Sequence, residues 1–205
     1  VEADENYTGR VTVPVLWDKK RSTIVNNESL EIMRMLDTRF EEYANDNTLL
    51  PDGKEDEVDR VLDEIYPSVN NGVYRAGFAE SQEAYDEAVD GLFESLSHWD
   101  DVLAEQRYLV GDELTEADVA MFTTLVRFDE VYHTHFKCNA RRIVDYDNLW
   151  GYVRDVYQTE GVGETVDMSH IKEHYYTTHH DLNPKEIVPK GPSPEFDEPH
   201  DRDRL

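Results

Sequence analysis

Two histidines and a cysteine are the first residues to consider, because their side chains bind metals or act as nucleophiles. His170 and His174 are four residues apart on a predicted helix, so they would share one face. No Glu follows His170 directly, as it does in the metalloprotease pattern, and Cys138 has no partner at a metal-ligand spacing. The sequence therefore predicts no metal site.

Cys138 is the only cysteine, so an internal disulfide is excluded and a reducing compartment such as the cytoplasm is favoured. It stands in the string HFKCN, where only the neighbouring Lys137 could lower the thiol pKa. Free cysteines are often buried as small hydrophobic residues. We therefore expect Cys138 to be structural.

A third group lies where a helix is predicted to begin. Asn26 or Asn27 could cap that helix, with Glu28 in its first turn and Ser29 beside it. A helix N-terminus also binds carboxylates, through its free N–H groups and its dipole. From the residues alone, helix capping is the simpler interpretation of Glu28 and Ser29.

The element that leads to this helix is a predicted hairpin. Residues 11–16 are rich in valine but contain Pro14, which marks an edge or a bend; residues 18–22 form a turn, and 23–25 a return strand. A lone two-stranded hairpin is marginal in water. We expect the rest of its sheet to precede Val1, with another chain as the alternative.

Beyond the hairpin, apolar spacing of three and four predicts helices almost throughout. The predicted organisation is a two-strand and one-helix remnant at 1–45, a linker at 46–57, an all-helical domain at 58–182 and an extended, proline-rich tail at 183–205. Thr115 and Asp118 form a capping box before an apolar run, with Leu114 and Val119 in the staple positions.

The composition is strongly acidic. The net charge is -26, and 46 Asp and Glu stand against 13 Arg and 7 Lys. Such a surface keeps a protein hydrated where concentrated salt screens its self-repulsion, so we expect a salt-rich cytoplasm; an acidic protein of ordinary salt is the alternative. Nucleic-acid binding is disfavoured because phosphate contacts need basic patches. No apolar run approaches membrane-spanning length.

Several long strings, in order, carry a resemblance. They are TVPVLWDKKRSTIVNNES, NNGVYRAGFA, LTEADVAMFTTLVRFDEVYHTHFKCN, NLWGYVRDVYQ, HIKEHYYTTH and NPKEIVPKGP. The chain resembles the glutathionyl-hydroquinone reductases, the Xi-class glutathione transferases, from about Gly9 to Arg202. The implied fold is mainly α: the C-terminal part of a thioredoxin-like α/β domain, followed by an all-α domain.

The resemblance implies an activity. These enzymes use the cysteine of a Cys-Pro-Trp-Ala motif to take glutathione off a quinol conjugate, and a second glutathione then releases the enzyme. That motif is absent from the 205 residues, so we expect the nucleophile upstream of Val1. The alternatives are a non-catalytic binding or scaffold module, and a generic glutathione transferase.

The resemblance also implies the binding residues. Val13, before a cis Pro14, would bind the backbone of the peptide-like thiol substrate. Glu28 and Ser29 would bind the γ-glutamyl end of that substrate. Either glutathione or γ-glutamylcysteine would suit that pocket. No metal is expected, and a homodimer is expected from the family alone.

For the quinone side, the resemblance implies Tyr74 and Tyr175 as catalytic residues. A phenol can stack on a quinol and donate a hydrogen bond to its oxygen. Tyr132, Tyr176 and Arg141 are weaker candidates for the same cavity.

Overall fold

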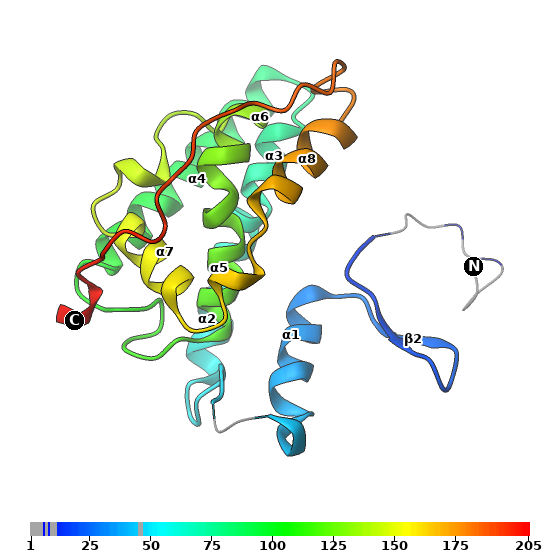
Figure 1. Cartoon of the computed structure of the whole chain (residues 1–205), viewed down its shortest axis with the longest axis vertical. Coiled ribbons are helices and arrows are strands. Elements are labelled where there is room, and N and C mark those ends of the chain that lie inside the picture. Colours follow the sequence, from blue (N-terminus) through cyan, green and yellow to red (C-terminus); the bar gives the residue numbers. More distant parts are fainter. Residues whose placement is uncertain (1–5, 7, 9–11, 45–46) are drawn as a thin grey trace. The chain divides into compact units, whose positions relative to one another are not determined.

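The structure is a computed structural model, and it describes residues 6, 8, 12–44 and 47–205. The chain divides into two compact units, Val1–Gly53 and Lys54–Leu205 (Figure 1). The division falls inside the segment 46–57 that we expected to link two domains. The end of that segment is already helical, because α2 begins at Glu55.

The first unit contains a short antiparallel hairpin of β1 (Leu16–Asp18) and β2 (Thr23–Asn26). The predicted first strand was too long at its start: Val11 lies outside the described residues, and residues 12–15 are irregular. Leu16 already pairs with Asn26. Residues before Leu16 would therefore have to pair beyond Asn26, where the chain turns into a helix.

That helix is α1 (Ser29–Thr38), followed by a short 3-10 turn at Glu41–Tyr43. Glu28 is the N-cap residue rather than a first-turn residue, which corrects the predicted boundary by one position. The Asn26 side chain stabilises the turn that leads into this helix, because its Oδ1 accepts a hydrogen bond from the Glu28 N–H at 2.7 Å.

The second unit is helical and carries the core, which is built from apolar side chains of almost every helix. Its α-helices are α2 (Glu55–Ile65), α3 (Gly72–Gly77), α4 (Gln82–Val102), α5 (Glu116–Arg127), α6 (His133–His135), α7 (Leu149–Gln158) and α8 (Met168–Thr178). Short 3-10 turns lie at Ile143–Asp145, Gly163–Thr165 and Arg202–Arg204.

The capping box at the start of α5 is present as predicted. The buried Asp118 carboxylate accepts hydrogen bonds from the Thr115 N–H and hydroxyl, each at 2.8 Å, and from the Leu109 N–H at 2.9 Å and the Tyr152 hydroxyl at 3.0 Å. Burial nevertheless raises the Asp118 pKa. One carboxylate thus ties α5 to the preceding loop and to α7.

Two helices continue into π-helical turns, at Tyr66–Asn70 after α2 and at Phe128–Tyr132 after α5. Such turns are rare and occur often at functional sites. The second turn changes the direction of the side chains that follow α5, and it carries Tyr132.

The tail after α8 is held in place at several points (Figure 1, orange to red). Lys172 of α8 forms a buried ion pair with Glu130 at 2.6 Å and donates to the carbonyl of Lys190 in the tail. Near the end, the buried Arg202 guanidinium donates to the carbonyls of Leu103, Gln106 and Arg107 at 2.5, 2.6 and 2.7 Å.

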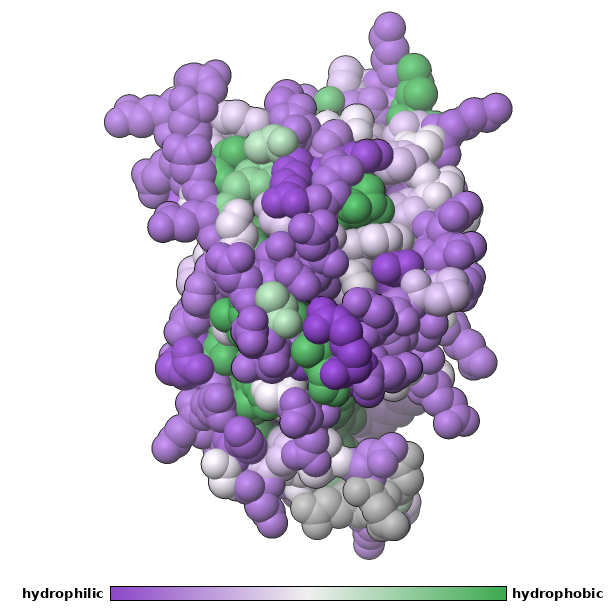
Figure 2. Space-filling model, turned by 90° about the vertical axis from the view of Figure 1, so that its left-hand side faces the viewer, coloured by the Kyte–Doolittle hydropathy of each residue, from purple (hydrophilic) through white to green (hydrophobic). Residues whose placement is uncertain are grey.

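The face shown in Figure 2 is covered mostly by hydrophilic side chains, with small, scattered apolar spots. This matches the sequence, in which charged residues make up 32%. In the described ranges, no helix is both long and apolar enough to cross a membrane.

Candidate active site

The tyrosines that the resemblance assigned to the quinone side meet in the helical unit. Tyr74 lies on α3 and Tyr175 on α8, 101 residues further along the chain. Their hydroxyl oxygens are 2.5 Å apart, and the Tyr175 hydroxyl also lies 2.9 Å from that of Tyr132. The three hydroxyls therefore form one hydrogen-bonded chain, centred on Tyr175.

The number of protons on the three tyrosine hydroxyls determines how many hydrogen bonds they can donate to a ligand. Each phenol has one O–H donor, so three hydroxyls hold three protons, and the two internal hydrogen bonds use two of them. Burial, followed by the neighbouring phenols, raises the pKa of Tyr132 and Tyr175 above the ordinary tyrosine value. Both stay protonated at neutral pH, and one proton remains for a ligand oxygen.

The walls around the hydroxyls are aromatic. The Phe136 ring stacks on Tyr132 with centroids 5.4 Å apart and meets Tyr74 edge-on at 5.3 Å. Gly77 permits this packing, because a Cβ at that position would overlap the Phe136 ring. Tyr74 remains 38% exposed, so the hydroxyl cluster is accessible from its side.

The other two candidates lie outside the hydroxyl cluster. The Tyr176 hydroxyl donates to the Glu130 carbonyl at 3.4 Å, on another side of α8. The Arg141 guanidinium lies 3.7 Å from the centroid of the Tyr146 ring and bonds the carbonyl of Asp145. Their assignment to the quinone side is therefore not supported by the geometry.

Two histidines near the end of α8 differ in their burial. His180 is exposed, whereas the neighbouring His179 is half-buried, and its Nδ1 lies 3.0 Å from the Nε2 of His135. Burial lowers the pKa of both imidazoles, to about 4 for His135. Within the described ranges, no three His, Cys, Asp or Glu side chains converge closely enough to hold a metal.

Cys138 is fully buried, with its Sγ 3.9 Å from the carbonyls of Val73 and Phe136. Burial raises its pKa to about 12, so the thiol carries almost no thiolate at neutral pH. Cys138 is therefore unsuited to act as a nucleophile.

The residues assigned to the thiol side all lie in the first unit. The Val13–Pro14 peptide bond is cis, and Val13 is 88% exposed. Glu28 and Ser29 stand exposed at the start of α1, and the Glu28 side chain makes no capping hydrogen bond. Helix capping thus leaves the Glu28 carboxylate unexplained.

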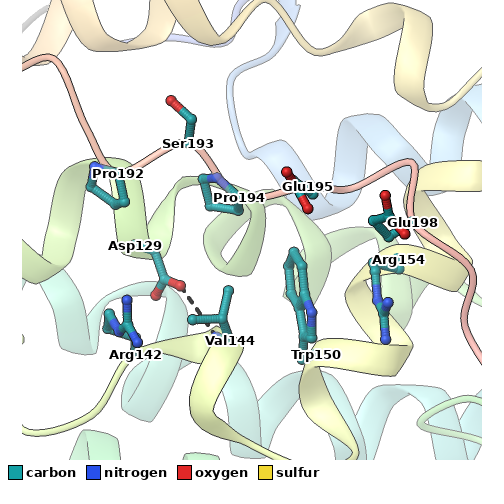
Figure 3. A pocket seen from close by; sticks show the side chains of 10 residues that line it. All are labelled: Asp129, Arg142, Val144, Trp150, Arg154, Pro192, Ser193, Pro194, Glu195 and Glu198. Carbon is teal, nitrogen blue, oxygen red and sulfur yellow. Dashed lines mark hydrogen bonds between the residues drawn. The ribbon is translucent and has the colours of Figure 1, made fainter.

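A cavity of about 580 Å³ lies between the tail and α7 (Figure 3). Neither the tyrosines of the hydroxyl cluster nor the residues assigned to the thiol side line it. Its guanidinium groups already have partners: Arg142 pairs with Asp145 at 2.8 Å, and Arg154 donates to the carbonyl of Pro199 at 2.6 Å. Hydrogen-bond chemistry therefore favours the tyrosine cluster over this cavity as the reactive site.

The sequence matches both domains of one protein family. Residues 2–39 match the glutathione S-transferase N-terminal domain, and residues 82–155 match the C-terminal domain. An Xi-class glutathione transferase from Natrialba magadii is 65% identical, with a TM-score of 0.94 over 96% of this chain and 60% of that chain. The glutathione-bound structure of YqjG from Escherichia coli K-12 is 54% identical, with a TM-score of 0.95 over 99% and 67%.

The chain belongs to the glutathione transferase family, and its fold is the mainly helical fold that we expected. Within that family it belongs to the Xi class. The glutathionyl-hydroquinone reductase YqjG of Escherichia coli (strain K12) is 54% identical over 204 residues. The match covers 99% of this chain and 62% of that protein, so the chain spans about three-fifths of its relative's length.

Proposed function

We propose that the protein carrying this chain reduces glutathionyl-hydroquinones to free hydroquinones with a thiol as co-substrate. The observation that carries the proposal is the hydroxyl chain of Tyr74, Tyr175 and Tyr132, which leaves one donor for a ligand oxygen. A hydroquinone conjugate supplies such an oxygen. The similarity to a glutathionyl-hydroquinone reductase supports the same reaction.

The thiol side of this proposal rests on the first unit. Val13, before the cis Pro14, would pair its backbone with the peptide-like thiol, and its exposure leaves that backbone accessible. Glu28 would accept from the ligand ammonium, while Ser29 and the N-terminus of α1 suit its carboxylate. Glutathione fits these requirements, as does γ-glutamylcysteine.

The reaction proceeds by thiol–disulfide chemistry. A cysteine thiolate outside the 205 residues attacks the glutathionyl sulfur of the conjugate's keto tautomer, in which the ring carbon that bears sulfur already carries a proton. The sulfur–carbon bond breaks, and its electron pair passes to the ring oxygen, which then takes a proton. The products are a hydroquinone and a cysteine–glutathione mixed disulfide. A second glutathione thiolate then attacks this disulfide, releasing oxidised glutathione and the free cysteine. For each conjugate reduced, one free glutathione is consumed, and the other half of the oxidised glutathione comes from the conjugate itself.

The tyrosines act on the oxygen of the ring. Negative charge that develops on a quinol oxygen is stabilised by a preorganised donor, and the protonated Tyr175, held by both neighbours, is such a donor. Tyr74 is the partly exposed member and would contact the incoming ring first.

The test is product analysis with the native protein, including every residue it carries beyond this chain. Incubated with a glutathionyl-hydroquinone and glutathione in high salt, it should release hydroquinone and oxidised glutathione in a one-to-one ratio. Replacing glutathione with γ-glutamylcysteine shows which thiol is used. Failure to release hydroquinone with either thiol rejects the proposal, and formation of new conjugates from electrophiles would favour a generic transferase.

We further propose that this enzyme works in a salt-rich cytoplasm as a homodimer. The net charge of -26 supports the first part, because concentrated salt screens the repulsion among its carboxylates. Sedimentation of the native protein at high salt tests the second part, since a species with the mass of a single chain would reject the dimer.

A further inference from the structure

A buried ion pair joins the two elements that carry Tyr132 and Tyr175. The Nζ of Lys172 on α8 lies 2.6 Å from the Oε2 of Glu130, which belongs to the π-helical turn at Phe128–Tyr132. The exposed fractions of these two side chains are only 10% and 6%. Glu130 stands two residues before Tyr132, and Lys172 stands three residues before Tyr175. The ion pair therefore links the same two elements as the hydroxyl cluster.

Further hydrogen bonds hold the members of this pair. The Tyr176 hydroxyl donates to the Glu130 carbonyl at 3.4 Å, so α8 contacts both the side chain and the backbone of Glu130. The Lys172 ammonium also donates to the Lys190 carbonyl in the tail at 3.2 Å. One lysine thus connects α8, the π-helical turn and the tail.

The energetics of this pair favour a geometric role over a stabilising one. Among the described residues, no well-aligned hydrogen-bond donor reaches the buried Glu130 Oε2, so the charge of Lys172 compensates it. Burying two charges costs about as much free energy as their attraction returns. A movement that separated them would leave both charges buried and unpaired, which is strongly unfavourable. The pair therefore restricts how α8 can lie against the π-helical turn.

The hydroxyl cluster depends on that restriction. The Tyr132 and Tyr175 hydroxyl oxygens are 2.9 Å apart, near the upper end of the range of about 2.5–3.0 Å for such hydrogen bonds. A small movement of α8 away from the π-helical turn would break this bond. The Tyr175 hydroxyl would then lose one of the two neighbours that orient it.

We propose that Glu130 and Lys172 are positioning residues for the reaction: their buried ion pair holds α8 so that the Tyr175 hydroxyl stays directed at the quinol oxygen. This inference rests on the proposed function and adds two residues that act through Tyr175, without contacting the substrate.

Burial also suits this pair to concentrated salt. The pair of Arg60 and Glu64 on α2 has side chains that are 58% and 43% exposed, and salt screens such surface pairs. A buried pair is screened much less. Glu130 and Lys172 can therefore keep α8 in place in the salt-rich cytoplasm proposed above.

The test is a double-mutant cycle in the native protein. Glu130→Gln combined with Lys172→Met removes both charges at similar volume, so this variant should fold. We expect kcat/KM for a glutathionyl-hydroquinone to fall roughly tenfold, because a reacting group is misplaced. The value for glutathione should stay unchanged, because the second half of the reaction does not involve the quinol oxygen. In a Tyr175→Phe background, the same two substitutions should cause no further loss.

The matched control removes another ion pair of the helical unit. Arg107 pairs with the buried Asp155 of α7 at 2.8 Å, outside the hydroxyl cluster. Arg107→Met combined with Asp155→Asn should leave both kcat/KM values unchanged in the folded protein. The proposal is overturned if Glu130→Gln/Lys172→Met loses no activity, or if its loss is as large in the Tyr175→Phe background as in wild type.

A second readout separates this inference from the proposed function, because it needs no turnover. In native protein labelled with 13C at the tyrosine Cζ, the NMR signal of each tyrosine reports the hydrogen bonding of its hydroxyl, and Tyr175→Phe assigns the signal of Tyr175. In Glu130→Gln/Lys172→Met this signal should move towards that of an exposed tyrosine. The signal of Tyr152, which donates to Asp118 at 3.0 Å, should not move. Such a shift supports the positioning role even if no conjugate turns over, and an unchanged Tyr175 signal overturns it even if the protein is a reductase.

Discussion

At the scale of single residues, the central feature is that three tyrosine hydroxyls share two hydrogen bonds, which leaves one proton for a substrate oxygen. Tyr175 is the middle member, so its hydroxyl determines where that proton can be offered. The surrounding rings restrict its position, because Phe136 and Tyr132 pack against it at 6.0 and 5.5 Å.

Removing that hydroxyl should therefore reduce catalysis and leave the fold intact. For Tyr175→Phe we expect kcat/KM for a glutathionyl-hydroquinone to fall about 100-fold, the scale of losing one donor to a developing oxyanion. Steady-state kinetics of the native protein measure it. Tyr85→Phe is the control, because the Tyr85 hydroxyl donates to the Lys137 carbonyl, outside the cluster. Equal losses in both variants would contradict the assignment.

Cys138 gives a second prediction at this scale. Its pKa of about 12 and its burial predict that iodoacetamide at pH 8 leaves it unmodified in the folded protein. Peptide mass spectrometry should find Cys138 labelled only after denaturation. Labelling in the folded state, at a rate typical of an exposed thiol, would show that the thiol is accessible and return it to the list of possible nucleophiles.

At the scale of elements, the sequence predicts what local chemistry determines. The capping box of Thr115 and Asp118 forms, because it depends on residues three apart. Apolar spacing likewise predicts helices almost throughout the chain beyond the hairpin, and α8 is one of those observed. The first strand was predicted too long, because its pairing depends on where the partner strand ends.

Contacts between helices that are distant in the sequence could not be predicted from residue spacing. Nothing in the spacing around Tyr74 or Tyr175 indicates that they meet, and the pairing of α3 with α8 came from family resemblance. The π-helical turn at Phe128–Tyr132 breaks the 3.6-residue period that would place Tyr132. The ring contacts among Phe78, Phe136 and His179 were also not predicted, because these residues are far apart in the sequence and meet through tertiary packing.

The contact between α6 and the end of α8 predicts an acid-sensitive stability. The pKa of His135 is lowered in the fold to about 4, so protonation favours the unfolded chain. The contribution of the uncharged His135 to the unfolding free energy is complete above about pH 6.5 and is lost as the pH falls towards 4. The groups facing His135 are His179 and Lys137, both of which oppose its protonation.

Denaturant unfolding between pH 7 and 4 measures this effect. In His135→Gln, the loss of unfolding free energy across that range should be smaller than in wild type by on the order of 3 kcal/mol. His170→Gln, on the exposed part of α8, should behave as wild type. Parallel pH curves for wild type and His135→Gln would contradict the prediction.

The attachment of the tail to the loop after α4 gives another prediction. Arg202→Met leaves one buried and two half-buried carbonyl groups without their donor, so we expect a loss of about 3 kcal/mol in unfolding free energy. Arg204→Met is the matched control, because Arg204 is half-exposed and forms a surface ion pair with Asp201; its effect should stay within about 0.5 kcal/mol. Similar losses in both variants would show that the tail is not anchored by Arg202.

At the scale of the whole molecule, charge is the dominant property. With a net charge of -26 on 205 residues, self-repulsion opposes the compact state at low ionic strength. Raising KCl from 0.1 to 2 M should increase the unfolding free energy by on the order of 2 kcal/mol as the screening length shortens. Sucrose of equal osmolality is the control for solvent exclusion. A stability that falls with KCl would contradict a salt-adapted surface.

The claim that the protein is a reductase acting through a cysteine outside this chain is tested most directly by one measurement. Native protein is mixed with one equivalent of a glutathionyl-hydroquinone, without free thiol, and its intact mass is recorded. We predict a gain of one glutathionyl group, reversed by dithiothreitol and mapping to a cysteine other than Cys138. An unchanged mass beside intact conjugate, or an adduct on Cys138 itself, would contradict the account.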